Sequence, residues 1–354
     1  IIMEEKKKTA REIIEGYDGP PVRIMEVCGT HTHEIFRLGI RKLLPEQVEL
    51  ISGPGCPVCV TQVGFIDEAI YLALERQVTI CTFGDLVRVP GTNMSLAGAR
   101  ERGAKIRIVY SPVDAKEYAK EHPKEQVTFL SVGFETTTPS ACLSVKKARE
   151  EGLTNYSILT ANKTMPQAYE ALKGSADIFL YPGHVNAITG TKLCEELAKE
   201  GVSGVVAGFT AKELLTALAV ALARFQEGRP FFVNCYPRVV TENGSPQAQK
   251  LVEEMMEPCD SEWRGLGVIK GSGMRLQEEW SAFDARKKYK IPLIQGKANP
   301  ACRCGDVLQG KCKPSDCKVF GKVCTPQHPI GACMVSGEGA CSAYYMYGEA
   351  EKMK

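Results

Sequence analysis

The last part of the chain contains seven of its fifteen cysteines, between Cys302 and Cys341. They follow the pattern C-x-C-x7-C-x4-C-x6-C-x8-C-x7-C, in a segment with many Gly and Pro residues and few long apolar runs. Such a segment buries too little apolar surface to fold by packing alone, so covalent or metal bonds must hold it together. Disulfides, zinc and an iron–sulfur cluster are the candidates.

Composition and the terminal sequence predict a cytoplasmic protein. The stretch Ile1–Arg11 is charged and has no apolar core, so we expect no signal peptide. The longest apolar helix candidate, Leu214–Phe225, is shorter than the roughly 20 residues needed to span a bilayer, so we expect no membrane segment. In a reducing cytoplasm, many cysteines favour metal binding or redox chemistry over structural disulfides. A formal net charge of +2 without a basic block indicates no nucleic-acid partner.

The pattern of strands and helices predicts an α/β fold. Short β-branched runs alternate with amphipathic helical segments as far as Phe225, which is typical of βαβ units with parallel sheets. We predict two similar parallel-sheet lobes facing a cleft, over residues 1–118 and 119–235. A smaller, mostly helical and irregular domain is expected over residues 236–354. Before its cysteines it should contain a helix at 246–256, a glycine-rich piece at 265–273 and a charged helix at 276–288.

Two thiol-containing loops follow predicted strands of the first lobe. One is Cys28-Gly-Thr-His-Thr-His33 and the other is Gly53-Pro-Gly-Cys-Pro-Val-Cys59. Ligands in open parallel sheets bind at the carboxyl ends of strands, and a helix N-terminus favours thiolate. A single strand-end cysteine is more often a buried apolar residue, and a cytoplasmic C-P-x-C is more often a thioredoxin-like dithiol. Three thiols and His31 at one sheet edge nevertheless indicate a functional site, suited to Fe(II), Zn(II) or Cu(I).

The corresponding loops of the second lobe contain Glu135 and His184. They are Gly133-Phe-Glu-Thr-Thr-Thr-Pro139 and Pro182-Gly-His-Val185, and both residues are expected to face the first lobe across the cleft. Helix capping by threonine and a structural histidine are the alternative interpretation. Neither loop matches a nucleotide-binding motif.

The spacing of the tail cysteines leaves the bound group open. Zinc ribbons show two tight C-x2-4-C pairs, whereas the only tight pair here is Cys302 and Cys304. The ferredoxin run C-x2-C-x2-C is also absent. Seven cysteines exceed the four that one cubane cluster needs, which suggests a cluster with a redox-active thiol pair beside it. A zinc module with spare thiols is the alternative.

These motifs, taken together, resemble the HypD family of nickel–iron hydrogenase maturation factors. Beyond the four loops quoted above, the resemblance rests on Met25-Glu-Val preceding Cys28, on Tyr181 preceding Pro182, and on the tail. There it covers Cys324-Thr-Pro326, Gly331-Ala-Cys-Met-Val-Ser336 and Glu338-Gly-Ala-Cys341. The motifs occur in the same order over nearly the whole chain. The thiol loops do not depart from the family pattern, whereas Cys312 is an additional cysteine.

The resemblance implies a scaffold on which the Fe(CN)2CO unit of the hydrogenase active site is assembled. The partners it implies are HypC, a small chaperone that supplies an N-terminal cysteine thiolate, and HypE, which delivers cyanide. Cys28 would be the iron ligand shared with HypC, and His31 would ligate or orient. Cys56 and Cys59 would be the dithiol of the cleft, for redox chemistry or iron handling, so the metal-binding set is Cys28, Cys56 and Cys59.

The family's tail implies one 4Fe–4S cluster, in surroundings similar to those in ferredoxin:thioredoxin reductase. We assign Cys304, Cys317, Cys324 and Cys333 to the cluster, with Cys302 and Cys341 as nearby redox thiols. Electrons would pass from the cluster to the dithiol and on to the Fe(II) substrate or its ligands. Two other functions stay open, a cluster-fed thiol–disulfide oxidoreductase and a zinc-stapled adaptor.

Overall fold

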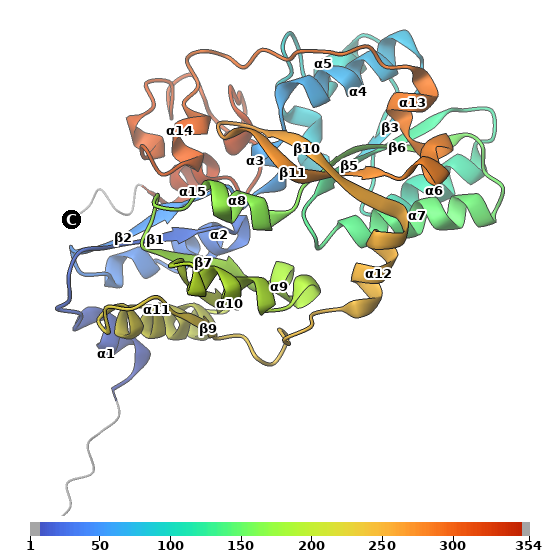
Figure 1. The fold of residues 1–354 in the computed structure, drawn as a ribbon. Coiled ribbons are helices and arrows are strands. Elements are labelled where there is room, and N and C mark those ends of the chain that lie inside the picture. Colours follow the sequence, from blue (N-terminus) through green and yellow to red (C-terminus); the bar gives the residue numbers. More distant parts are fainter. Residues whose placement is uncertain (1–7, 349–354) are drawn as a thin grey trace, which may run out of the picture.

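Two parallel sheets and one antiparallel hairpin form the β-structure of the protein (Figure 1). The coordinates are a computed structural model that describes residues 8–348. Residues 1–7, in the stretch expected to carry no signal peptide, lie outside the described residues. The predicted α/β class is confirmed.

The first sheet has the strand order β2-β1-β7-β8-β9, with parallel neighbours throughout. Its strands are β1 (Val22–Glu26), β2 (Val48–Ser52), β7 (Ile178–Pro182), β8 (Ser203–Ala207) and β9 (Phe232–Asn234). Successive side chains of a strand point to opposite faces, so Ile24 and Met25 belong to different cores. The core around Ile24 is covered by α1 (Ala10–Glu15), α2 (Gly29–Arg37) and α11 (Ala211–Phe225). The core around Met25 is covered by α8 (Met165–Ala171), α9 (Gly183–Thr189) and α10 (Lys192–Lys199).

The second sheet has the strand order β4-β3-β5-β6 and is also parallel. Its strands are β3 (Thr79–Thr82), β4 (Ile106–Ile108), β5 (Val127–Gly133) and β6 (Tyr156–Asn162). One face packs against α4 (Val63–Glu75) and α5 (Leu96–Glu101), the other against α6 (Pro112–Glu121) and α7 (Thr138–Glu150). Short elements connect these parts, namely η1 (Ile40–Leu43), α3 (Pro57–Val60) and η2 (Gly84–Arg88).

The strands are divided between the lobes differently from the predicted division at residues 118 and 119. The chain leaves the first sheet after β2, builds the whole second sheet, and returns at β7. There β7 pairs with β1, with Met25 opposite Phe179. Strands β3 and β4 therefore belong to the second sheet, and the loop that carries His184 belongs to the first.

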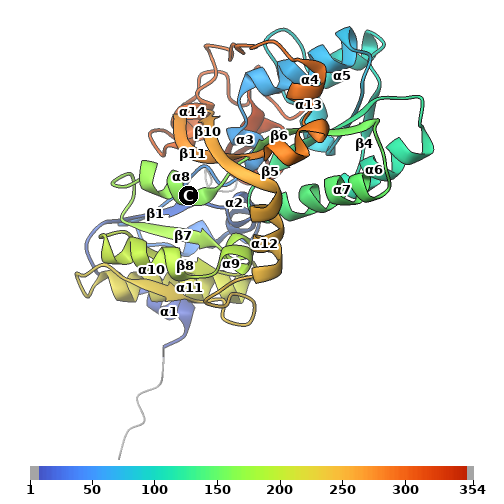
Figure 2. The same cartoon turned by 45° about the vertical axis from the view of Figure 1, so that its right-hand side comes forward.

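The region after residue 235 crosses both lobes. Helix α12 (Pro246–Met255) runs from α9 of the first lobe to α7 of the second (Figure 2). It leads into an antiparallel hairpin of β10 (Met256–Trp263) and β11 (Gly267–Leu276), where only a glycine-rich piece was expected. The predicted charged helix is divided into η3 (Glu278–Phe283) and α13 (Ala285–Tyr289). The cysteine-rich tail contains four short elements, α14 (Cys304–Leu308), η4 (Pro314–Asp316), η5 (Ala332–Met334) and α15 (Ala340–Tyr347).

The apolar segment near Leu214 is helix α11, as expected, and one face of this helix is buried. Across residues 8–348, no helix combines the length and the apolar character needed to cross a bilayer.

Candidate functional site

The two thiol loops of the first lobe lie side by side, because β1 and β2 are parallel neighbours. The N–H of Gly29 donates to the carbonyl oxygen of Gly55 at 3.0 Å, which joins the loops. A Cβ on Gly55 would lie 2.2 Å from the backbone nitrogen of Cys28, so only glycine allows this approach. A Cβ on Gly29 would lie 3.2 Å from that of Cys56. The expected convergence of these loops at one sheet edge is therefore observed, while a ligand shared by their sulfur atoms stays a prediction.

Cys28 is the residue immediately before α2 and is buried. Burial raises the pKa of its thiol to about 12, against the opposing effect of the His31 N–H. The negative charge of Glu338 raises the pKa further. At neutral pH this thiol is protonated, so it becomes a thiolate only when a cation compensates the charge.

The dithiol occupies the N-terminus of α3. Cys56 caps this helix, and its Sγ accepts a hydrogen bond from the N–H of Cys59 at 3.4 Å. Pro57 provides the first helical residue, where a missing N–H has no cost. Cys56 is 3% exposed and Cys59 is fully buried. All fifteen cysteines lie within the described residues and are free thiols.

His31 is buried and stacks on Phe209, with ring centroids 4.7 Å apart. Its Nε2 lies 3.0 Å from the carbonyl oxygen of Gly208, so Nε2 carries the proton and Nδ1 keeps a lone pair. Nδ1 is buried and has no hydrogen-bond partner in residues 8–348. Burial lowers the pKa of the imidazole to about 4. His31 is therefore a neutral imidazole with an unused acceptor, which is the form that ligates metals.

Glu135 reaches the first lobe from the end of β5. Its Oε1 accepts a hydrogen bond from the N–H of Met165 at 2.8 Å, and its Oε2 is buried without a partner among residues 8–348. Burial raises the pKa of this carboxyl to about 7. The nearby Tyr169 hydroxyl is buried within the electrostatic influence of both Glu135 and Cys28. The expected position of Glu135 opposite the first lobe is thus observed, and Tyr169 is a site residue that the sequence did not indicate.

His184 is exposed and stacks on Phe209 with ring centroids 4.0 Å apart. The same phenylalanine stacks with His31, so Phe209 joins the two histidines. The assignment of His184 to the second lobe was wrong, because β7 pairs directly with β1. His184 consequently lies on the same sheet edge as Cys28.

The tail also contributes polar groups to this edge. Thr30 Oγ1 donates to Glu338 Oε1 at 2.6 Å, and His33 Nδ1 lies 3.0 Å from the carbonyl oxygen of Gly337. The charge of Glu338 acts on both Cys28 and His184. Glu338 belongs to a motif that the sequence analysis quoted without a role. Its place between two cysteines, in Cys333…Glu338-Gly-Ala-Cys341, was the only sequence feature that could have indicated a role in the site.

Six tail cysteines line one small cavity together with Val307, Phe320 and Met334. They are Cys302, Cys304, Cys317, Cys324, Cys333 and Cys341. Cys312 lies elsewhere, in a surface pocket beside Arg23 and Glu49. The six cysteines assigned to the cluster and its redox thiols are thus gathered in one place, and the additional cysteine is separate.

Neighbouring thiols that act on one another's pKa connect this cavity to the dithiol. The Cys59 thiol contacts those of Cys56 and Cys333, and Cys333 in turn contacts Cys304 and Cys341. Cys304 contacts Cys302. The result is a continuous thiol row between two cysteine groups that lie far apart in the sequence. No group of three or more His, Cys, Asp or Glu residues in the described part of the chain is arranged to hold one metal ion.

Comparison with known proteins gives consistent matches. The family model "HypD: Hydrogenase formation hypA family" matches residues 4–348. The chain is 42% identical over 347 residues to the Hydrogenase maturation factor HypD of Cupriavidus necator, which covers 94% of this chain and 92% of the relative. Proteins with the same name from Escherichia coli and Rhodobacter capsulatus are 43% and 44% identical. Those matches cover 94% and 93% of this chain and 90% of each relative.

Proposed function

The chain belongs to the HypD family of hydrogenase maturation factors, and from this premise we propose that it is the scaffold for assembly of the Fe(CN)2CO unit of nickel–iron hydrogenase. The observation that carries the proposal is the thiol row from Cys56 through Cys59 to Cys333. It supports two tasks within one connected site, holding the iron substrate and supplying electrons to it.

Cys28 is the proposed ligand of the substrate iron, shared with the thiolate of a HypC-type partner. Soft thiolates hold Fe(II) while leaving positions open for cyanide and carbon monoxide. Since burial keeps the Cys28 thiol protonated, iron binding displaces a proton from its Sγ. The lone pair on Nδ1 of His31 is available as a further ligand or as a hydrogen-bond acceptor for a bound group. A HypE-type partner would deliver the cyanide.

The donor set of the tail cavity fits a 4Fe–4S cluster, because four thiolates are needed and six cysteines line the cavity. Cys304, Cys317, Cys324 and Cys333 would hold the cluster, with Cys302 and Cys341 as the redox thiols. When bound, such a cluster would supply electrons one at a time. Cys333 is the residue that joins the cavity to the dithiol, since its thiol contacts Cys59.

A cluster-fed thiol–disulfide oxidoreductase is the second candidate function. The position of Cys56 at a helix N-terminus, with Cys59 beside it, favours this function. The burial of both thiols disfavours it, because a protein disulfide cannot reach them without opening of the site. Failure to reduce a small disulfide at a useful rate, while the iron unit forms normally, would exclude this candidate.

Infrared spectroscopy tests the scaffold directly. The protein is co-produced with HypC-type and HypE-type partners and purified without oxygen, and the spectrum is searched for cyanide and carbonyl stretches. We expect the bands in the wild type and in Cys142→Ala, whose thiol is buried in the second lobe. We expect none in Cys28→Ala. Bands that persist in Cys28→Ala would exclude Cys28 as the iron ligand.

An iron and acid-labile sulfide count on the same preparation tests the cluster separately. About four of each per chain is the expected result for one cubane. One zinc per chain, without iron or sulfide, would exclude the cluster and favour the zinc module.

A further inference from the structure

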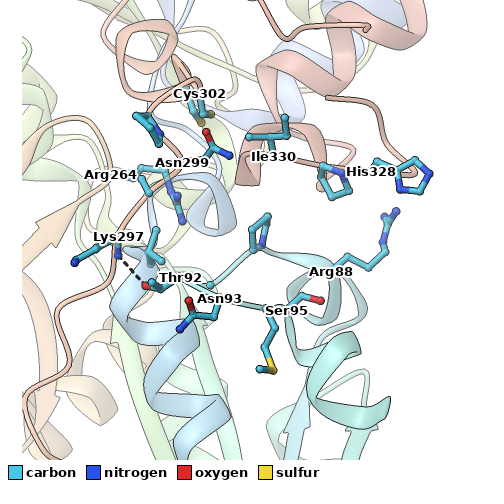
Figure 3. A pocket seen from close by; sticks show the side chains of 18 of the residues that line it. Arg88, Thr92, Asn93, Ser95, Arg264, Lys297, Asn299, Cys302, His328 and Ile330 are labelled. Carbon is cyan, nitrogen blue, oxygen red and sulfur yellow. Dashed lines mark hydrogen bonds between the residues drawn. The ribbon is translucent and has the colours of Figure 1, made fainter. Parts of the chain in front are cut away.

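A large pocket with both polar and apolar lining residues lies on the outer side of the tail thiols (Figure 3). Its volume is about 880 Å³, within the range of small-molecule sites. Three parts of the chain meet there, namely the loop around Arg88–Ser95, the hairpin turn at Arg264, and the tail between residues 297 and 330. Cys302 and Cys304 line the same pocket. A ligand in it would therefore lie against the thiol row that the site already described uses.

The charged side chains that line this pocket are all cationic. Arg264 and Lys297 lie on one side, and Arg88 lies on the other, beside the imidazole ring of His328 (Figure 3). No aspartate or glutamate is among the residues that line the pocket. Asp67 is not among these residues but is connected to them, because its two carboxylate oxygens accept the N–H and hydroxyl of Thr92.

The two arginines are held in place by neutral groups. Arg88 donates to the carbonyl oxygens of Pro326 at 2.8 Å and Val335 at 3.3 Å. Arg264 donates through Nε and Nη2 to the carbonyl oxygen of Thr61, at 3.1 and 2.8 Å. Neither forms an ion pair with another described residue, and the same holds for Lys297. The positions of the two arginines are therefore fixed while the charges of all three side chains stay uncompensated, which is a prepared arrangement for an anion.

Neutral hydrogen-bonding groups complete the lining. The backbone N–H of Lys297 donates a hydrogen bond to Thr92 Oγ1 at 2.8 Å, which connects the tail to the loop of the second lobe. Asn93, Ser95 and Asn299 also line the pocket (Figure 3). Such groups fix the orientation of a ligand whose charge the cations attract.

We propose that this pocket binds a small molecule carrying two or more carboxylate or phosphate groups, beside Cys302 and Cys304. The pocket is large enough for such a molecule, cationic side chains lie on opposite sides of it, and no carboxylate is among the residues that line it. Binding would join the loop at Arg88, the hairpin and the tail through one ligand, and would cover the outer side of the thiol row.

Calorimetric titration of the anaerobically purified, full-length protein tests the proposal at low salt, where charge interactions are least screened. Pyrophosphate and citrate are the probes, so the two arms distinguish phosphate from carboxylate recognition. Arg264→Gln keeps a donor for Thr61 but removes the charge, and Arg264→Lys keeps the charge. Lys297→Gln changes an exposed side chain, and Lys322→Gln is the control, because Lys322 is exposed in the same tail but does not line the pocket.

We expect at least one probe to bind with a Kd below about 1 mM. Loss of one charged contact should weaken that binding about tenfold in Arg264→Gln and in Lys297→Gln. Arg264→Lys and Lys322→Gln should stay within about threefold of the wild type. Hydrogen exchange should slow in residues 292–300 when the probe binds. Absence of binding by both probes would overturn the proposal. Wild-type affinity in Arg264→Gln, or protection confined to residues that do not line the pocket, would also overturn it.

Discussion

Replacing Glu135 by Gln tests whether the site holds a neutral carboxyl group between its two lobes. Oε1 accepts the N–H of Met165, and Oε2 is buried without a partner in the described part of the chain. Burial raises the pKa of Glu135 to about 7, against the opposing hydrogen bond from Met165. Gln keeps the acceptor oxygen and the shape of the side chain but cannot ionise, so the variant isolates the effect of the proton.

The direction of the effect follows from the raised pKa. The stability that Glu135 contributes is fully present below its ordinary pKa of 4.5 and is lost as the pH rises through about 7. Between these values the unfolded chain has lost the proton that the folded protein keeps. At about 1.36 kcal/mol per pKa unit, the difference between the ordinary and the raised pKa of Glu135 corresponds to roughly 3 kcal/mol of unfolding free energy. Relative to the wild type, Glu135→Gln should therefore gain roughly 3 kcal/mol of unfolding free energy between acidic and neutral pH.

Urea unfolding of both proteins at several pH values from about 4.5 to about 8 measures this difference. Differences between variant and wild type are used, so every other titrating group cancels. Glu101→Gln is the matched control, because Glu101 is exposed, and its curve should run parallel to the wild type. A difference that stays constant within about 0.5 kcal/mol over this pH range would refute the argument that burial keeps Glu135 protonated.

Three further predictions concern the sheet edge and the thiol row. Arg41→Met leaves the buried Glu26 carboxylate with the hydroxyl donors Thr32 and Ser52 but without its ion-pair partner at 2.5 Å, so urea unfolding should show a loss of about 3–5 kcal/mol. Glu26→Gln in the same chain should restore most of this stability, and a loss below about 1 kcal/mol in Arg41→Met would contradict the argument. Gly55→Ala places a Cβ 2.2 Å from the Cys28 nitrogen, so it should lower the unfolding free energy by about 1–3 kcal/mol and abolish the infrared bands. Gly337→Ala, with open space around it, should do neither, and unchanged bands in Gly55→Ala would show that the loops need not touch. Cys333→Ser should lower the iron and sulfide count to below half of the wild-type value, whereas Cys312→Ser should leave it unchanged. A full count in Cys333→Ser together with a lowered count in Cys312→Ser would exclude the assignment of the tail ligands.

Local sequence patterns predicted most elements and both thiol loops. Strands β1 and β2 are β-branched runs followed by glycine-containing loops, and their neighbouring positions bring Cys28 and Cys56 together. The same patterns carry no information about which distant strands pair. The pairing of β7 with β1 depends on tertiary packing across more than 150 residues, so the lobes were divided at the wrong place and His184 was assigned to the wrong one.

The hairpin and the polar groups around Cys28 were less accessible to sequence reasoning. Strand β10 contains Pro258 and alternates between exposed and half-buried residues, so it lacks the apolar alternation that marks a strand. Tyr169 reaches the site from α8, and Glu338 reaches it from the tail. Tyr169 has no neighbouring motif residue, and the motif around Glu338 does not reveal its contact with Thr30. The contact between Cys59 and Cys333 is likewise a product of the folded chain.

The return of the chain to the first sheet at β7 has a consequence for synthesis on the ribosome. Strands β1 and β2 leave the ribosome early, yet β1 lacks its second neighbour until β7 has been translated, more than 150 residues later. At about 5–20 residues per second this delay is on the order of 10–30 s. Cys333 and Glu338 are translated later still. Nascent chains therefore carry the Cys28 and Cys56 thiols in an incomplete sheet during this interval. The order of the segments along the chain thus exposes these thiols to oxidation or to binding of an unintended metal ion before the site is complete.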